Sequence, residues 1–445
     1  MSVKIIELND RAVHVGDETG VILQSPGFAL ADGSSIVLGE AAERQARLQP
    51  TNSYNKFWHE LSLDPISHGN NFRHFADIAY AHLMHLAEEA EIGGDVIFAV
   101  PGNFTRQQLA ILLGLVNHTP FKAGGVVNSS VAAAALAAEA SDIIYIDLQL
   151  HQAVVTRLNT QGDHLQAGTT IQVPGVGSQN FMDLMMQMAT GMFIQQCRFN
   201  PQHNADSEQQ LYNELPGWLA EAEDGNLILE LRAGETLHTA KMPTESLINS
   251  LGGHFNKINE QLAPMLTERD TQILISPAMA ALPGFSASLP QQSQLIVLDQ
   301  HAVSRSALEH QELIIAGDEG IKLVESLPVA KSKPANSSQA PQTVSPTHVL
   351  FKHRAVPIKD LQIANQAEVN GHAGSANTML LSIAGLPEDL GRIYQSGGEV
   401  RFQSLADVSR VNGKSVTGET SLSIGDQIKF GSSAEAMTLI KVSDG

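Results

Sequence analysis

The chain of 445 residues carries 47 acidic and 27 basic side chains, for a formal net charge of −20. This charge repels the phosphates of nucleic acids and of anionic lipids, so we expect protein or small-molecule partners, no nucleic acid and no membrane insertion. A hydrophobic share of 43% and one cysteine, Cys197, predict a globular chain of two or three domains without an internal disulfide.

The N-terminal elements predict the start of an α/β domain. The first ten residues, MSVKIIELND, have neither the basic region nor the long apolar core of a signal peptide, and we expect a cytoplasmic protein. Val3–Leu8 is an apolar strand, and Ala12–Val15 and Gly20–Leu23 continue it as a meander. A turn at Asn9-Asp10 separates the first two strands.

Strands and helices alternate through the next predicted stretch. Asp95–Val100 is a short apolar strand ended by a proline, and Thr105 with Gln108 three residues later forms a capping box that begins a helix. A second, Ala-rich helix follows a brief strand, and we expect Ser129 and Ser130 to cap it. This alternation is typical of the α/β class.

The motifs VPGNFTRQQ, VVNSSVAAAAL and IIYIDL resemble, in this order, the nucleotide-binding domain of heat-shock-70 chaperones of the DnaK type. The segments VLGEAAERQARLQPTNSYNKF upstream and VPGVGSQNFMDLMM downstream are similar to the same family in the same order. The resemblance covers roughly the first three quarters of the chain. It implies a two-lobed fold of the actin-like ATPase superfamily for residues 1–328.

The residues that would contact a nucleotide in that family are replaced. The run matching its first phosphate loop has Asp10 and neither glycine nor hydroxyl, which predicts an ordinary polar hairpin turn because a carboxylate repels phosphate. Trp58 stands where the family has a catalytic lysine, and Lys56 lies two residues earlier. Ser129 replaces the glutamate that helps to position the attacking water, and a hydroxyl is a poor general base.

The second phosphate loop has lost its glycines. The family follows a strand-ending aspartate with leucine, three glycines and threonine, whereas Asp147 is followed here by LQLHQ. Side chains therefore stand where a glycine backbone would approach the phosphates. We interpret Asp147 as a retained structural residue, with a cofactor contact as the alternative.

The remaining anion-binding candidate is the turn VPGVGS. Gly175, Gly177 and Ser178 lead into a predicted helix whose first N–H groups would be free for a phosphate. The alternative is a simple strand-to-helix turn capped by Ser178. If a nucleotide binds, these three residues and Asp147 are its expected contacts. Otherwise we expect no cofactor, no metal ligand and no catalytic residue, with ATP and magnesium as the alternative.

Two further patterns argue against a ligand site. Ser276-Pro277 replaces the glycine pair that holds the base in the family. His74, His82 and His85 fall on one side of a predicted helix, but no acid or cysteine completes a metal-ligand spacing. We therefore expect a partly buried histidine face.

The C-terminal region differs in composition. Residues 329–347 include KSKPANSSQAPQTVSPT, typical of a flexible linker, and residues 348–445 predict a small all-β sandwich. Its end, VSRVNGKSVTGETSLSIGDQIKFG, resembles forkhead-associated domains, which read phosphothreonine, although the family's Ser-x-x-His is missing. Ser409, Arg410 and Asn412 are the candidate partner contacts.

Together these patterns predict a heat-shock-70-like scaffold or adaptor that binds proteins and hydrolyses nothing. The first alternative is a divergent ATP-binding chaperone, and the second is a phosphopeptide-reading regulator that acts through the C-terminal module. The partner and the oligomeric state stay open.

Overall fold

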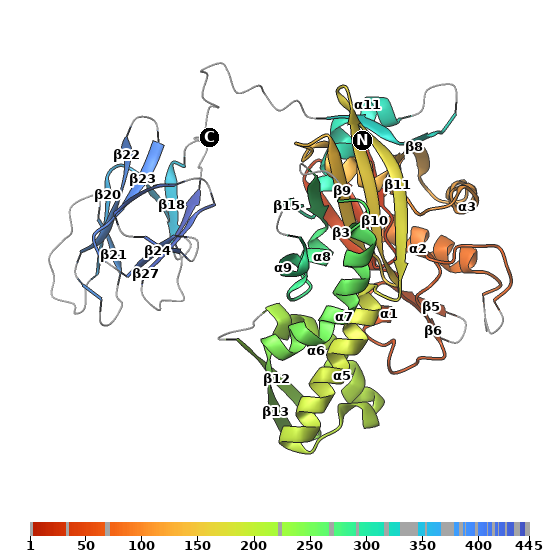
Figure 1. The fold of residues 1–445 in the computed structure, drawn as a ribbon, viewed down its shortest axis with the longest axis horizontal. Helices are drawn as coiled ribbons and strands as arrows, with labels where there is room; N and C mark the ends of the chain where they lie inside the picture. Colours follow the sequence, from red (N-terminus) through yellow and green to blue (C-terminus); the bar gives the residue numbers. More distant parts are fainter. Residues whose placement is uncertain are drawn as a thin grey trace. The chain divides into compact units, whose positions relative to one another are not determined.

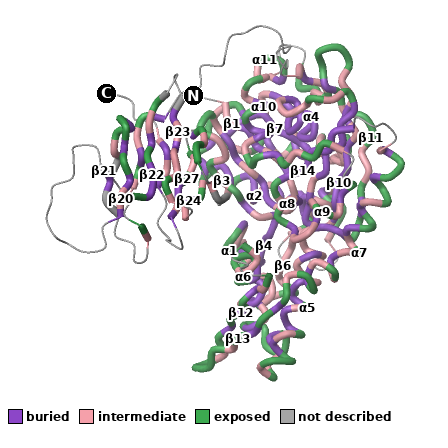
Figure 2. Tube along the Cα trace, turned by 60° about the vertical axis from the view of Figure 1, so that its left-hand side comes forward, coloured by how far each residue is buried: buried purple, intermediate pink, exposed green. Residues whose placement is uncertain are grey.

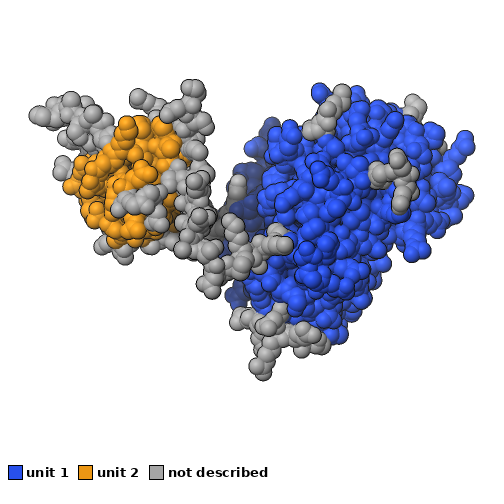
Figure 3. Space-filling model, turned by 90° about the horizontal axis from the view of Figure 1, so that it is seen from above, with its two compact units in different colours: residues 1–333 blue, residues 334–445 orange. Residues whose placement is uncertain are grey.

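The structure, a computed structural model, describes residues 3–32, 35–66, 72–220, 225–266, 271–290, 293–315, 320–329, 346–351, 354–365, 378–381, 386–387, 389–396, 399–406, 408–411, 414–416, 418–422, 425–430 and 437–440. Its residue contacts divide the chain into two compact units, Met1–Lys333 and Pro334–Gly445 (Figure 3). This division falls inside the expected linker, of which residues 330–345 lie outside the described residues. Among the described residues, no helix is long and apolar enough to span a membrane.

The first unit contains two mixed sheets of six strands each. The first sheet has the order β16-β8-β7-β1-β2-β3. Its strands are β1 (Lys4–Glu7), β2 (Ala12–Asp17), β3 (Gly20–Pro26), β7 (Asp95–Val100), β8 (Lys122–Asn128) and β16 (Leu323–Val324). The second sheet has the order β15-β14-β9-β10-β11-β17. Its strands are β9 (Asp142–Leu148), β10 (Gln152–Gln161), β11 (His164–Pro174), β14 (Gln272–Ile275), β15 (Gln294–Val297) and β17 (Ser326–Pro328).

The two sheets repeat one arrangement. In the first, β1 pairs antiparallel with β2 and parallel with β7, β2 pairs antiparallel with β3, and β7 pairs parallel with β8. In the second, β9, β10, β11, β14 and β15 take the corresponding places and directions. The chain thus contains a duplicated five-stranded sheet with a meander on one side and two parallel strands on the other.

Helices pack against both sheets. They are α1 (Glu40–Glu43), α2 (Phe75–Glu89), α3 (Arg106–Val116), α4 (Ser129–Ala135), α5 (Ser178–Cys197), α6 (Ala205–Ala220), α7 (Thr244–Leu262), α8 (Pro277–Ala280), α9 (Phe285–Ser288), α10 (Ala302–Glu309) and α11 (Gln311–Ile314), with the 3₁₀ turn η1 (Pro201–His203). Side chains of α4 and α10 share one core with β1, β7, β9 and β14. The small side chains of α4 let both sheets approach this helix closely, and Figure 2 shows β7, β10 and β14 largely buried.

Smaller elements complete the unit. The strands β4 (Ala29–Asp32), β5 (Ser35–Leu38) and β6 (Ser53–Tyr54) form a three-stranded sheet. The hairpin of β12 (Asn226–Ala233) and β13 (Thr236–Pro243) packs with α5 and α6 at one end of the unit (Figure 1). Met185 and Met186 of α5 are buried in the core of this unit. The sequence predicts an interruption at Pro216, but α6 continues through it. Buried Leu211 and Leu215 offset the hydrogen bond that proline cannot donate.

The second unit consists of two mainly antiparallel sheets, in the orders β19-β18-β28-β27-β24-β25 and β21-β20-β22-β23-β26. The strands are β18 (His348–Phe351), β19 (Arg354–Pro357), β20 (Leu361–Asn365), β21 (Thr378–Leu381), β22 (Asp389–Ser396), β23 (Glu399–Ser404), β24 (Ser409–Val411), β25 (Lys414–Ser415), β26 (Glu419–Leu422), β27 (Gln427–Phe430) and β28 (Met437–Ile440). Buried side chains from both sheets form one core. The prediction of an α/β region followed by an all-β region is therefore confirmed.

Candidate functional site

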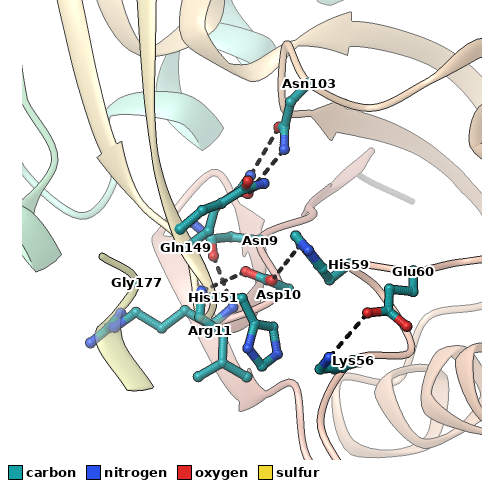
Figure 4. Close-up of polar contacts among 12 residues, drawn as sticks. Asn9, Asp10, Arg11, Lys56, His59, Glu60, Asn103, Gln149, His151 and Gly177 are labelled. Atoms are coloured by element: carbon teal, nitrogen blue, oxygen red, sulfur yellow. Dashed lines mark hydrogen bonds and ion pairs between the residues drawn. The ribbon is translucent and has the colours of Figure 1, made fainter. Parts of the chain in front are cut away.

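Two turns from different sheets meet at the segments that resemble phosphate loops. The β1–β2 turn carries Asn9 and Asp10, and the β9–β10 turn carries Leu150. The Asp10 Oδ1 atom accepts a hydrogen bond of 2.6 Å from the Leu150 N–H (Figure 4). The Asn9 Nδ2 atom donates to the Leu148 carbonyl over 3.2 Å. A side-chain carboxylate of the chain thus takes a backbone donor that a phosphate would need.

The start of α5 lies against the same β9–β10 turn. The N–H groups of Ser178 and Gln179 donate to the carbonyls of Gln149 and Leu150, each over 2.9 Å. A Cβ atom on Gly177 would lie 2.3 Å from the Leu150 oxygen, so only glycine allows this approach. The helix begins after Gly177, which is its N-cap, and Ser178 is not the cap. The first N–H groups of α5 are therefore engaged within the chain.

The four candidate cofactor residues do lie near one another. Gly175 has a φ of 70° and donates its N–H to the His151 carbonyl over 3.3 Å, which places it at the β9–β10 turn with Gly177 and Ser178. Asp147 is the penultimate residue of β9 and accepts a hydrogen bond of 3.0 Å from the Asn9 side chain. Burial and the charge of Glu7 raise the pKa of Asp147 to about 6. Its contacts are those of a residue that holds the two turns together.

Asp10 lies in the expected hairpin turn, but it is buried and its pKa is raised. The turn is present, but the side chain of Asp10 is only 6% exposed. Burial raises the pKa of this carboxyl to about 7, and the nearby charge of Asp147 adds to the effect. The Oδ2 atom has no hydrogen-bond partner among the described residues, and the nearest ring nitrogen, Nδ1 of His59, is 3.6 Å away. Sequence reasoning missed this burial because the contact joins residues 140 positions apart.

Lys56 and Trp58 are the two positions that were compared with a catalytic lysine. Lys56 forms an ion pair of 3.1 Å with Glu60, four residues later (Figure 4). Trp58 is buried, and its indole N–H donates to Nδ1 of His82 over 2.9 Å. Since that nitrogen accepts, Nε2 of His82 carries the proton and donates to the Ser25 hydroxyl. Burial lowers the pKa of His82 to about 3, so the ring is neutral. His82 is thus a hydrogen-bonded core residue of the expected histidine face.

The sequence predicts that Ser129 and Ser130 cap α4, and this prediction is wrong. The cap is Asn128, whose Oδ1 atom accepts from the N–H groups of Ser130 and Val131 over 3.0 and 3.4 Å. The Ser130 hydroxyl instead donates to Thr156 over 3.2 Å. Ser129 is buried and offers no negative charge at the position of the family's glutamate.

A cavity of about 820 Å³ opens beside the two turns. Its walls come from the β1–β2 turn, the segment between β6 and α2, the residues before and at the start of α3, and the β9–β11 strands. Its polar lining includes Asp10, Asn103, Gln107, Gln108, Gln149 and Gln172. Its aromatic lining includes Tyr54, Trp58, Phe75 and Phe104. Among the residues that the structure describes, no group of three or more His, Cys, Asp or Glu side chains could hold a metal ion.

A second cavity is lined by Asp147 and Ser276, among other residues. Its volume is about 200 Å³. Small-molecule sites commonly measure about 300–1,000 Å³. The space beside these residues is therefore small for a nucleotide.

The candidate partner residues of the second unit differ in solvent exposure, since Ser409 is buried and Arg410 is exposed. Ser409 is fully buried, and its hydroxyl donates to the Ala406 carbonyl over 3.2 Å and accepts from Ser404 over 2.8 Å. The geometry corrects the expectation of a partner contact for Ser409, whose side chain lies inside the sandwich. Arg410 is exposed, and Asn412 lies outside the described residues.

Comparison with known proteins gives no family for this chain. No protein-family model matches it. No match was found among curated proteins. Its function is therefore inferred from the contacts of these two turns and their cavities.

Proposed function

We propose that this protein is a non-catalytic scaffold or adaptor, built on the two-lobed frame of actin-like and heat-shock-70 ATPases, that binds other proteins. The duplicated five-stranded sheets support the frame, because each lobe of such a fold would contain one sheet. Packing of α4 and α10 between the sheets also supports it. The resemblance of the motifs in colinear order points to the same family.

The observation that carries the proposal is the way the two phosphate-loop turns bond to each other. Asp10 occupies the backbone donor of Leu150, and the first donors of α5 are occupied by the carbonyls of the β9–β10 turn. A nucleotide would have to break these bonds and lie beside a buried carboxyl group. Each lost hydrogen bond costs about 1 kcal/mol, and ionised Asp10 would add charge repulsion.

If no nucleotide binds at these turns, the chain has no nucleotide-driven means of switching between conformations. A ligand shifts a conformational equilibrium only through different affinities for the two states. A nucleotide-driven chaperone therefore needs phosphate contacts that change between states, and this chain offers none at the described turns. Two units with separate cores instead provide two binding surfaces on one chain, which raises avidity for a partner that contacts both.

Affinity capture from the native cytoplasm tests this proposal. We expect a defined set of partner proteins whose retention is the same with magnesium-ATP, with apyrase and with no addition. A heat-shock-70 chaperone carried through the same protocol is the control, and it should release its clients when ATP is added. Capture of many unfolded proteins that ATP releases would contradict the proposal and would establish the divergent chaperone instead.

A further inference from the structure

The cavity beside the two turns contains a buried carboxylate oxygen that lacks a partner. Asp10 lines the cavity, and its buried Oδ2 atom has no hydrogen bond to any described residue. Burial lowers the pKa of His59, so the closest ring, at 3.6 Å, is neutral near pH 7. Leaving a buried carboxylate without a cation or hydrogen-bond donor is costly, and a ligand that supplies one would be favoured.

The side chains of aspartate and glutamate give the lining of this cavity a negative charge. Asp10, Glu60 and Asp64 line the cavity, and its described residues include no lysine or arginine. Lys56 lies outside this lining and pairs with Glu60. The net charge of the whole chain, −20, is also negative. Anionic ligands are therefore repelled and cations are attracted.

The shape and the aromatic walls favour an organic cation over an inorganic one. Tyr54, Trp58, Phe75 and Phe104 line the same space, and aromatic faces attract ammonium and guanidinium groups. Gln107, Gln152 and Gln172 also line the cavity, and their amide oxygens can accept the remaining N–H groups. The volume of about 820 Å³ suits a small molecule or an inserted side chain, and the described residues hold no metal-binding group.

We propose that this cavity binds an organic cation, an ammonium or guanidinium group that donates a hydrogen bond to Oδ2 of Asp10 and packs against the aromatic wall around Trp58. The cation belongs either to a free small molecule or to a lysine or arginine side chain of a bound protein. The site is distinct from anion binding by a phosphate loop, because its recognition depends on a carboxylate.

Calorimetric titration of the full chain tests the site with matched probes. Arginine amide carries the guanidinium group, and citrulline amide has the same length with a neutral ureido group in its place. We expect arginine amide to bind at least about tenfold more tightly than citrulline amide. Asp10→Asn keeps the oxygen that accepts from Leu150 and removes the charge, and it should weaken arginine amide by at least about tenfold. Glu89→Gln removes an exposed carboxylate of α2 outside the cavity and should leave the affinity unchanged.

The source of the cation follows from one further probe, a short peptide that contains arginine. Tighter binding of the peptide Gly-Arg-Gly than of arginine amide would assign the site to a protein side chain, and the reverse would assign it to a small molecule. Four results would overturn the proposal. They are equal binding of citrulline amide and arginine amide, unchanged binding of arginine amide by the Asp10→Asn variant, displacement of arginine amide by magnesium chloride at constant ionic strength, and no binding of either arginine probe. These outcomes are independent of whether the chain binds ATP.

Discussion

Replacing Gly177 by alanine is expected to lower the free energy of unfolding of the first unit by about 3–5 kcal/mol. The added Cβ would lie 2.3 Å from three backbone atoms, the Leu150 oxygen, the His151 carbonyl carbon and the Gln152 nitrogen. The β9–β10 turn would have to move and would lose its hydrogen bonds to the start of α5. Urea unfolding followed by tryptophan fluorescence measures the effect, because both tryptophans, Trp58 and Trp218, lie in the first unit.

A second glycine of the same helix is the matched control. Gly191 lies inside α5, is exposed, and has no atom within 4 Å of an added Cβ. Gly191→Ala should therefore raise stability by about 1 kcal/mol through helix propensity alone. Equal stability of Gly177→Ala and the wild type would show that the turn does not pack on α5 in this way.

Replacing Asp10 by asparagine is expected to stabilise the first unit by about 2–4 kcal/mol at pH 8. The pKa of the carboxyl is about 7 in the folded chain, above its ordinary value of 3.8. Its contribution to stability is fully present below pH 3.8 and is lost as the pH rises through 7. Asparagine keeps the acceptor for Leu150 and has no charge to bury.

The pH dependence distinguishes this cause from a general packing effect. The difference in unfolding free energy between Asp10→Asn and the wild type should grow by about 2–3 kcal/mol from pH 5 to pH 8. Gly191→Ala changes no titratable group, so it serves as the control and should give a nearly flat difference. A difference that shrinks as the pH rises would mean that Asp10 is ionised and well paired in the folded chain.

Most of the fold follows from patterns along the sequence. Alternating apolar strands and capped helices predict the α/β unit, and the capping box at Thr105 is present as expected. The sequence does not identify the capping residue of a helix where several neighbouring side chains can accept the same hydrogen bonds. Asn128, Ser129 and Ser130 can all cap a helix, and the extended backbone of Asn128 selects it. Pro216 marks a break in sequence, but burial of its helix neighbours keeps α6 continuous.

The candidate site was harder to predict because it depends on contacts between distant segments. The missing glycines after Asp147 predict the loss of a phosphate cradle. They do not predict that Asp10 takes the donor of Leu150 or that Gly177 lets the turn approach α5. The two exceptional features, a buried acid in a turn and an aromatic-walled cavity, arise only when both sheets come together. Lining residues such as Gln149 and Trp58 carry no local signal of a shared site.

Calorimetric titration of the full chain with magnesium-ATP tests the central claim, that the two turns are closed to nucleotide. We predict no saturable heat and no change in melting temperature at millimolar concentrations. A ligand at 100 times its Kd would stabilise the fold by about 2.7 kcal/mol, which a melting curve would show. Saturable binding with a Kd below about 100 µM, together with an upward shift of the melting temperature, would contradict the account.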